Sequence, residues 1–230
     1  MSARELITEH LDLWTGAVTK KSSSGRGNNG KVELTGIKRL RALILELAVR
    51  GQLVPQSPED TLFRELLLQL RGNHAPIKTR SRRTISGEVE EDEKPFSIPK
   101  TWAWTRLGEI VDVLDSQRKP ITKTARKAGP FPYYGASGIV DYVDGYLFDE
   151  SLVLVGEDGA KWDKGEATAF SISGKSWVNN HAHVLRPIRE AVTDEYLVYF
   201  LTAADLNRFI TGMTVPKLNQ ARLSSIPVAT

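Results

Sequence analysis

The residues with the clearest potential for chemistry lie in residues 116–140. This segment has five basic side chains and no Asp or Glu, although the whole chain has 31 basic and 28 acidic residues. Such a local excess of positive charge can neutralise phosphate groups, which dominate the affinity of proteins for nucleic acids. The segment therefore indicates a nucleic-acid-binding surface, and the alternative is a solvated loop that is basic without a binding role. The five residues are Arg118, Lys119, Lys123, Arg126 and Lys127.

Polar and aromatic side chains on this segment and on other loops are the candidates for contacting bases. Contacts to phosphate position a protein on a duplex, whereas contacts to base edges carry the sequence information. The candidates are Gln117, Tyr133, Tyr134, Ser137, Lys161, Trp162, Lys217 and Asn219. For Trp162 a core position is an equal alternative. Trp102 and Trp104 are assigned to the core, because alternating large apolar residues at the start of a domain usually anchor its first strand.

Two groups of residues could support catalysis, but neither is well formed. His181 and His183 would share one face of a strand and could bind a metal, although a packed pair is the favoured interpretation. A Mg²⁺-dependent nuclease is the other alternative, and its carboxylate and lysine set would be Asp149, Glu157, Asp158 and Lys161. The chain has no cysteine and shows no phosphate-binding glycine loop, dinucleotide fingerprint or methyltransferase motif. The sequence therefore favours binding over catalysis.

The elements that must position these side chains are predicted to form an α+β domain over residues 98–230. Short apolar stretches separated by Gly, Asp, Asn and Ser are typical of a curved, mainly antiparallel sheet. They cover residues 110–114, 139–143, 146–148, 152–155, 168–172 and 181–185. Pro120, Pro130 and Pro132 argue against a helix in the basic segment, which is predicted to be a loop. Residues 194–210 are predicted to be helical and to flank the sheet.

The N-terminal part is predicted to consist of helices and linkers. Residues 1–14 have helical spacing, and residues 19–31 are a polar linker. Residues 37–50 and 57–71 have amphipathic patterns, with Ser57 as the expected cap and Pro58 at the first helical position of the second helix. Together they predict a helical hairpin. The predicted division is therefore residues 1–72 for the helices, 73–97 for a charged linker and 98–230 for the DNA-binding domain.

The sequence contains no membrane or export signal. No apolar run approaches the ~20 residues that a membrane span requires. Glu5, Glu9 and Asp12 interrupt the apolar residues near the N-terminus, which excludes a signal peptide there. We therefore expect a cytoplasmic protein without membrane partners.

Three stretches resemble the specificity (S) subunits of type I restriction–modification systems, and they occur in the order found in that family. The start of the domain is similar to the start of a target recognition domain, through Ile98, Pro99, Trp102, Trp104, Leu107 and Gly108. The end of the domain is similar through Gly212, Thr214, Val215, Pro216, Lys217, Leu218 and Asn219, then Leu223, Ile226, Pro227 and Val228. Residues 45–56, LELAVRGQLVPQ, resemble the helix that often precedes such a domain.

This resemblance implies a non-catalytic DNA-binding subunit. Type I S subunits read double-stranded DNA through two target recognition domains spaced by long helices. They hold modification subunits that methylate adenine, and the complex recruits the restriction subunit. The resemblance thus implies no cofactor on this chain, with S-adenosylmethionine, ATP and Mg²⁺ on partner subunits. A DNA-binding module outside restriction systems is the alternative function.

The chain departs from the S-subunit pattern at its end. It stops just after Val228, where a full subunit would continue into a spacer helix and a second recognition domain. It is therefore expected to be a fragment or, less favoured, a half-size subunit that associates with a second copy. Residues 37–50 and 57–71 are expected to pack on the spacer helices and to meet the modification subunit, unless they only complete the fold of this chain.

Overall fold

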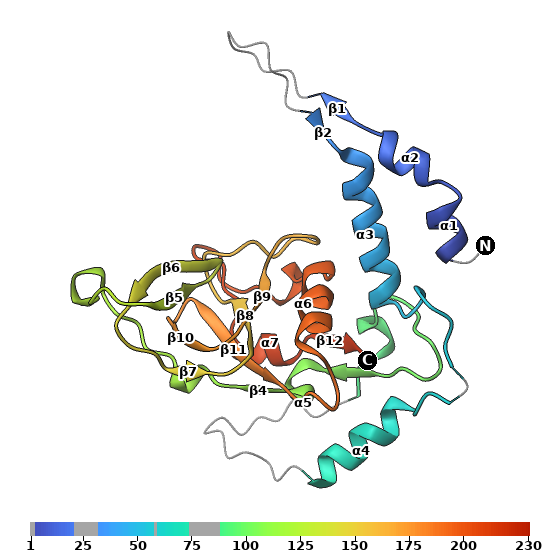
Figure 1. Ribbon diagram of the computed structural model, residues 1–230. Coiled ribbons are helices and arrows are strands. Elements are labelled where there is room, and N and C mark those ends of the chain that lie inside the picture. The colour runs from blue at the N-terminus through green and yellow to red at the C-terminus, as the bar shows by residue number, and fades with distance from the viewer. Residues whose placement is uncertain (1–2, 21–31, 58, 74–87) are drawn as a thin grey trace. The chain divides into compact units, whose positions relative to one another are not determined.

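The protein is described by a computed structural model in which residues 3–20, 32–57, 59–73 and 88–230 are described (Figure 1). The chain divides into two compact units, Met1–Asp60 and Thr61–Thr230. The two helices of the predicted hairpin therefore belong to different units. Among the described residues, no helix combines the length and the apolar composition that crossing a membrane requires.

The first unit is built on a close approach of two helices. The predicted helix over residues 1–14 is divided into α1 (Ala3–Thr8) and α2 (Leu11–Gly16), and α2 packs against α3 (Thr35–Val49). A Cβ on Gly36 would lie 1.9 Å from the Trp14 carbonyl oxygen, so only glycine permits this contact. The first two residues of the predicted linker form β1 (Thr19–Lys20), which pairs antiparallel with β2 (Val32–Glu33), directly after the linker. Residues 21–31 lie outside the described residues.

The second unit begins with α4 (Phe63–Asn73), which starts later than predicted. Ser57 forms a turn instead of a cap: its backbone N–H donates to Asp60 Oδ2, and its hydroxyl accepts from Glu59 N–H. The helix then starts where the Phe63 N–H donates to the Thr101 carbonyl. Phe63 and Leu67 are buried one helical turn apart, so α4 is fixed by packing within its own unit.

The acidic end of the predicted charged linker is folded onto the domain. Residues 74–87 lie outside the described residues, but Val89 is buried and Glu91–Glu93 form a short 3₁₀ turn, η1. Arg106 donates to both carboxylate oxygens of Glu93, to one at 2.8 Å and to the other at 2.5 Å. The predicted linker over residues 73–97 is therefore wrong for residues 88–93, because the buried Arg106 binds the Glu93 carboxylate.

The domain start forms a small sheet that joins the two ends of the unit. Strand β3 (Trp104–Arg106) pairs antiparallel with the C-terminal strand β12 (Pro227–Ala229). The Trp102 ring meets Tyr196 edge-on at 6.0 Å, and Trp104 lies 6.3 Å from Phe200. Both tryptophans are half-buried and pack on α6 (Asp194–Ala203), so they lie at the edge of the core.

Two four-stranded sheets make up the rest of the domain. One has the order β4 (Val111–Val113), β11 (Ala182–Pro187), β8 (Leu152–Gly156), β9 (Ala169–Ile172), and all its pairs are antiparallel. The other has the order β6 (Gly138–Val143), β5 (Phe131–Gly135), β10 (Lys175–Val178), β7 (Phe148–Asp149), and only β5 and β10 are parallel. The predicted α+β fold with a mainly antiparallel sheet is confirmed.

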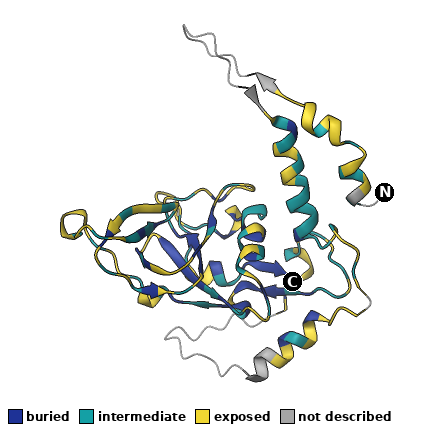
Figure 2. Ribbon diagram, in the orientation of Figure 1, coloured by how far each residue is buried: buried dark blue, intermediate teal, exposed yellow. Residues whose placement is uncertain are grey.

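The core lies where the two sheets meet. Every residue of β8 is buried, and so are most residues of β11 (Figure 2). Leu154, Val178 and Val184 belong to one cluster that both sheets contribute to. Helix α6 covers β8 and β9, and the short helices α5 (Leu107–Ile110) and α7 (Gln220–Ser224) pack against each other. This core holds the loops at the ends of β8 and β11 in fixed positions.

Several local predictions need correction. Residues 131–135 form a strand although the basic segment was predicted to be a loop, because Pro132 lies outside the pairing with β10, which begins at Tyr133. Strand β10 was not predicted. The strand expected from residue 110 begins at Val111, after α5. The helix expected over residues 194–210 ends at Ala203 and is followed by a 3₁₀ turn, η4 (Asn207–Phe209).

Candidate nucleic-acid interface

The three lysines of the basic segment are the cations available to solvent. Two 3₁₀ turns, η2 (Asp115–Gln117) and η3 (Lys123–Ala125), position the segment before β5. Lys119, Lys123 and Lys127 are exposed, and none forms an ion pair with a carboxylate of the described residues. Their side chains can therefore reach a phosphate without breaking an internal contact.

Arg118 is instead part of the interior. Its side chain is only 12% exposed, and Nη1 lies 2.6 Å from Glu157 Oε2 and donates to the Ala182 carbonyl at 2.7 Å. Its Nε donates to the carbonyl of Asp115. A phosphate contact would have to displace these partners, so the geometry favours a role in holding the segment on β8 and β11.

Arg126 and Tyr133 form a second internal contact. The Arg126 guanidinium lies 4.5 Å from the centre of the Tyr133 ring and 3.0 Å from Asp141 Oδ2. That hydrogen bond holds the pKa of Asp141 below its usual value. Tyr133 is 1% exposed, and its hydroxyl accepts from the Ile121 N–H. The hypothesis that Tyr133 contacts bases is therefore not supported: its ring fixes the segment against β5.

The remaining candidates divide into exposed and packed side chains. Gln117, Ser137 and Lys161 are exposed, with Lys161 3.7 Å from Glu166. Tyr134 is half-buried against Phe170, and burial raises the pKa of its hydroxyl. Trp162 is buried, and its indole N–H donates to the Gly156 carbonyl, so the core alternative is the one the structure supports.

Glu157 is the centre of a charged cluster that the sequence reasoning did not assemble. One carboxylate oxygen pairs with Arg118, and the other lies 2.7 Å from Lys217 Nζ. The hydrogen bond to Glu157 raises the pKa of Lys217, with burial acting in the opposite direction. We call this the Glu157 cluster. Its members are Asp115, Arg118, Glu157, Asp158, His181, His183 and Lys217.

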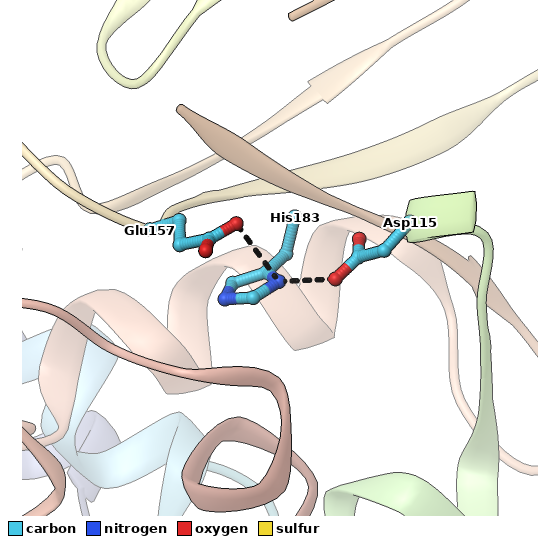
Figure 3. Close-up of side chains that lie close together, drawn as sticks. All are labelled: Asp115, Glu157 and His183. Carbon is cyan, nitrogen blue, oxygen red and sulfur yellow. Dashed lines mark hydrogen bonds and ion pairs between the residues drawn. The ribbon is translucent and has the colours of Figure 1, made fainter. Parts of the chain in front are cut away.

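Within this cluster, His183 connects the start of the basic segment with the segment that carries Lys217 and Asn219. Its Nδ1 lies 2.6 Å from Asp115 Oδ2 and 3.8 Å from Glu157 Oε2 (Figure 3). Its Nε2 lies 2.7 Å from the carbonyl oxygen of Leu218. Asp115 directly precedes the basic segment, and Leu218 follows Lys217. The buried imidazole therefore ties two segments that are distant in the sequence.

The cluster contains side chains of the types that bind metals, but these side chains already form ion pairs and hydrogen bonds within the protein. The ligand atoms of Asp115, Glu157 and His183 lie within 4.8 Å of one another. Arg118 and Lys217 neutralise the carboxylates, and both ring nitrogens of His183 face oxygen atoms of the protein. The predicted pairing of His181 with His183 on one strand face is wrong, since His181 precedes β11 and contacts Asp158.

The nuclease set is not assembled either. Within the part of the chain that the structure describes, the only group of three metal-ligating residues includes Glu157 of this set but neither Asp149 nor Asp158. Asp149 lies on β7 in the other sheet, and Lys161 is directed to Glu166. These residues do not provide the carboxylates and lysine of a metal-dependent hydrolase.

Lys217 and Asn219 have structural partners. Lys217 joins Glu157, as described above, and its backbone pairs with Thr211. Asn219 caps α7: its side-chain oxygen accepts from the Arg222 N–H, and its amide donates to Thr211 Oγ1 at 3.3 Å.

Asp115, which was not predicted, could have been found from its spacing of three residues from Arg118, a spacing typical of ion pairs on a helical turn.

Comparison with known proteins identifies the family. Residues 99–230 match the type I restriction modification DNA specificity domain, which covers more than half of the chain. The chain belongs to the type I restriction–modification specificity family. The part that matches contains the basic segment and the Glu157 cluster.

Relatives in this family are longer than the chain. The EcoAI specificity subunit of Escherichia coli is 34% identical over 86% of this chain and 36% of its own length. The EcoEI specificity subunit, also from Escherichia coli, is 44% identical over 49% of this chain and 20% of its own length. A crystal structure of the type I S subunit of M. genitalium has a TM-score of 0.46 at 10% identity, covering 56% of this chain and 34% of that one. The chain thus spans about a third of the EcoAI subunit.

Proposed function

We propose that this chain binds double-stranded DNA in a sequence-dependent manner, as part of the specificity subunit of a type I restriction–modification complex. Membership of the specificity family carries this proposal. The chain would direct the reactions of partner subunits and hold no cofactor itself. S-adenosylmethionine, ATP and Mg²⁺ would be bound by those partners, and a complex that acts on cellular DNA would work in the cytoplasm.

The exposed lysines of the basic segment would provide the electrostatic part of binding. Lys119, Lys123 and Lys127 can approach phosphate, whereas Arg118 and Arg126 would keep the segment in place through Glu157 and Asp141. Exposed polar side chains beside them, such as Gln117, Ser137 and Lys161, are candidates for contacting base edges. Within the basic segment, the lysines would therefore bind DNA and the arginines would hold the segment in position.

The helices of the first unit and α4 would contact other proteins. We propose that they pack on spacer helices and on the modification subunit, through which the restriction subunit joins the complex. Leu11 and Leu13 in α2 and Leu62 and Leu68 in or near α4 are exposed large apolar side chains that such contacts could cover. If the chain is a half-size subunit, association with a second copy of the chain would cover these apolar side chains.

Salt dependence of DNA binding tests the electrostatic part of the proposal. Log affinity falls with log salt, and each phosphate contact makes this fall steeper by roughly 0.9, so replacing Lys119, Lys123 and Lys127 by Glu should reduce the magnitude of the slope by about 2 to 3. Fluorescence anisotropy with a duplex at several salt concentrations measures it. Lys123→Glu alone should lower the slope by about 1, and its matched control is Lys100→Glu, which reverses an exposed lysine outside the segment. Binding that ignores salt would contradict the proposal.

A further inference from the structure

The loop of residues 211–217 carries an exposed apolar tip. Met213 is 105% exposed, the highest value among the large hydrophobic residues described, and Val215 is 64% exposed. Thr214 and Pro216 beside them are exposed as well, and the tip, residues 212–216, has no charged side chain. Apolar groups gathered at a projecting tip gain free energy if a partner removes them from water.

The base of this loop is held by hydrogen bonds and by a glycine. The backbone N–H of Thr211 donates to the Lys217 carbonyl at 2.9 Å, and the Lys217 N–H donates back at 2.8 Å. Gly212 has φ +91°, and a Cβ there would lie 2.4 Å from the Val215 carbonyl oxygen. Another residue would therefore strain the turn. The tip is thus presented by a closed turn whose position does not depend on burying Met213 or Val215.

The Glu157 cluster places this loop beside the basic segment. Lys217, at the end of the loop, and Arg118, in the basic segment, bind the two oxygens of one carboxylate at 2.7 and 2.6 Å. Leu218 is fully buried, its N–H donates to the Glu157 carbonyl, and its own carbonyl contacts His183. The apolar tip and the segment with the exposed lysines therefore share one rigid support.

We propose that Met213 and Val215 enter a groove of duplex DNA and contact bases while the lysines of the basic segment contact phosphate. This inference rests on the proposed DNA-binding function. Apolar side chains recognise the thymine methyl group in the major groove, or insert between base steps from the minor groove. Duplex DNA is the favoured partner because Lys217, at the base of this loop, and Arg118, in the basic segment, bind the same Glu157 carboxylate. An apolar contact of this kind adds discrimination between sequences and leaves the salt slope unchanged.

The double substitution Met213→Ser with Val215→Ser tests this role in the 230-residue chain. The probe is a duplex that the unsubstituted chain enriches from a randomised pool, compared with an unselected duplex of equal length. We expect affinity for the selected duplex to fall by about 10-fold, as for the loss of one good base contact. Affinity for the unselected duplex, the salt slope and the melting temperature should stay unchanged. The matched control is Tyr199→Ser, an exposed apolar residue of α6.

Each other outcome has a defined meaning. Unchanged discrimination by the double variant overturns the base contact and leaves the proposed function intact. If discrimination is unchanged and co-purification with a modification subunit is lost, the tip contacts protein instead of DNA. An unsubstituted chain that binds DNA but enriches no sequence overturns the sequence dependence in the proposed function together with the base contact. Absence of salt-dependent binding by the unsubstituted chain overturns the proposed function together with this inference.

Discussion

At the scale of single residues, neighbours in the sequence have opposite environments. Arg118 is buried in ion pairs, whereas Lys119, the next residue, is exposed to solvent. Tyr133 is buried against Arg126 and accepts a hydrogen bond from Ile121. Whether a basic or aromatic residue of this segment is exposed to solvent or fixed in the fold therefore depends on which side chains of other strands reach it.

Glu157 is the residue on which the most contacts of the interface depend. Replacing it by Gln removes the negative charge between Arg118 and Lys217. Among the described residues, Asp115 at 3.4 Å is then the remaining carboxylate that pairs with Arg118, whose side chain is 12% exposed. Losing one partner of a buried ion pair is costly, so we expect stability to fall by roughly 2–4 kcal/mol. Denaturant unfolding at neutral pH measures this change.

A control separates this effect from the simple loss of one carboxylate. Glu190 is exposed and forms no ion pair with a described residue, so Glu190→Gln should change stability by less than about 0.5 kcal/mol. Equal effects of the two substitutions would show that the Glu157 cluster does not stabilise the interface.

At the scale of elements, the domain depends on a contact that closes its two ends. Strand β3 pairs with β12, and Arg106 of β3 also binds Glu93 of η1 and the carbonyl of Ser225. The hydrogen bond from Arg106 holds the pKa of Glu93 below its usual value of 4.5. Residues before the domain and residues at its end are therefore joined through one guanidinium.

The lowered pKa of Glu93 predicts a pH dependence of stability. The unfolded state binds this proton more readily than the folded state, so the stabilisation is present above pH 4.5 and is lost as the pH falls through the lowered pKa. Because Glu93 is about one-third exposed, we expect Glu93→Gln to cost about 1 kcal/mol at pH 7. Unfolding curves between about pH 3 and 7 should show this difference shrinking in acid. A difference that grows in acid would contradict the assignment.

At the scale of the whole molecule, the chain separates into two units with different proposed roles. All residues of the Glu157 cluster and of the basic segment lie in Thr61–Thr230. The exposed apolar residues Leu11 and Leu13 lie in Met1–Asp60. Truncation should therefore separate DNA binding from the partner contacts of the first unit, whereas the contacts proposed for α4 would stay with Thr61–Thr230.

Deleting residues 1–60 tests this division. Residues 61–230 should fold, and should bind duplex DNA with the same affinity and salt slope as the whole chain, because no residue of the proposed interface is removed. Co-purification with a modification subunit should weaken, because the helices of the first unit are removed and only the contact proposed for α4 remains. Loss of DNA binding by the folded truncated chain would contradict the division of roles.

The sequence by itself was sufficient for those features that local patterns encode. The apolar stretches at residues 139–143, 152–155 and 168–172 correspond to strands β6, β8 and β9, because alternation and β-branched residues act within a few positions. The domain motifs at residues 98–108 and 212–228 led to the family for the same reason. The charge excess of the basic segment could also be counted directly.

Only the tertiary structure decided which of these side chains face solvent. Arg118 pairs with a carboxylate 39 residues away and His183 with one 68 residues away, so neither contact leaves a periodic signal in the sequence. The start of α4 and the pairing of β10 with β5 likewise depend on partners from distant segments. Burial and ion pairing are properties of residues that folding brings together, and this is why the sequence indicates a candidate interface but not which of its residues are exposed and which hold the fold.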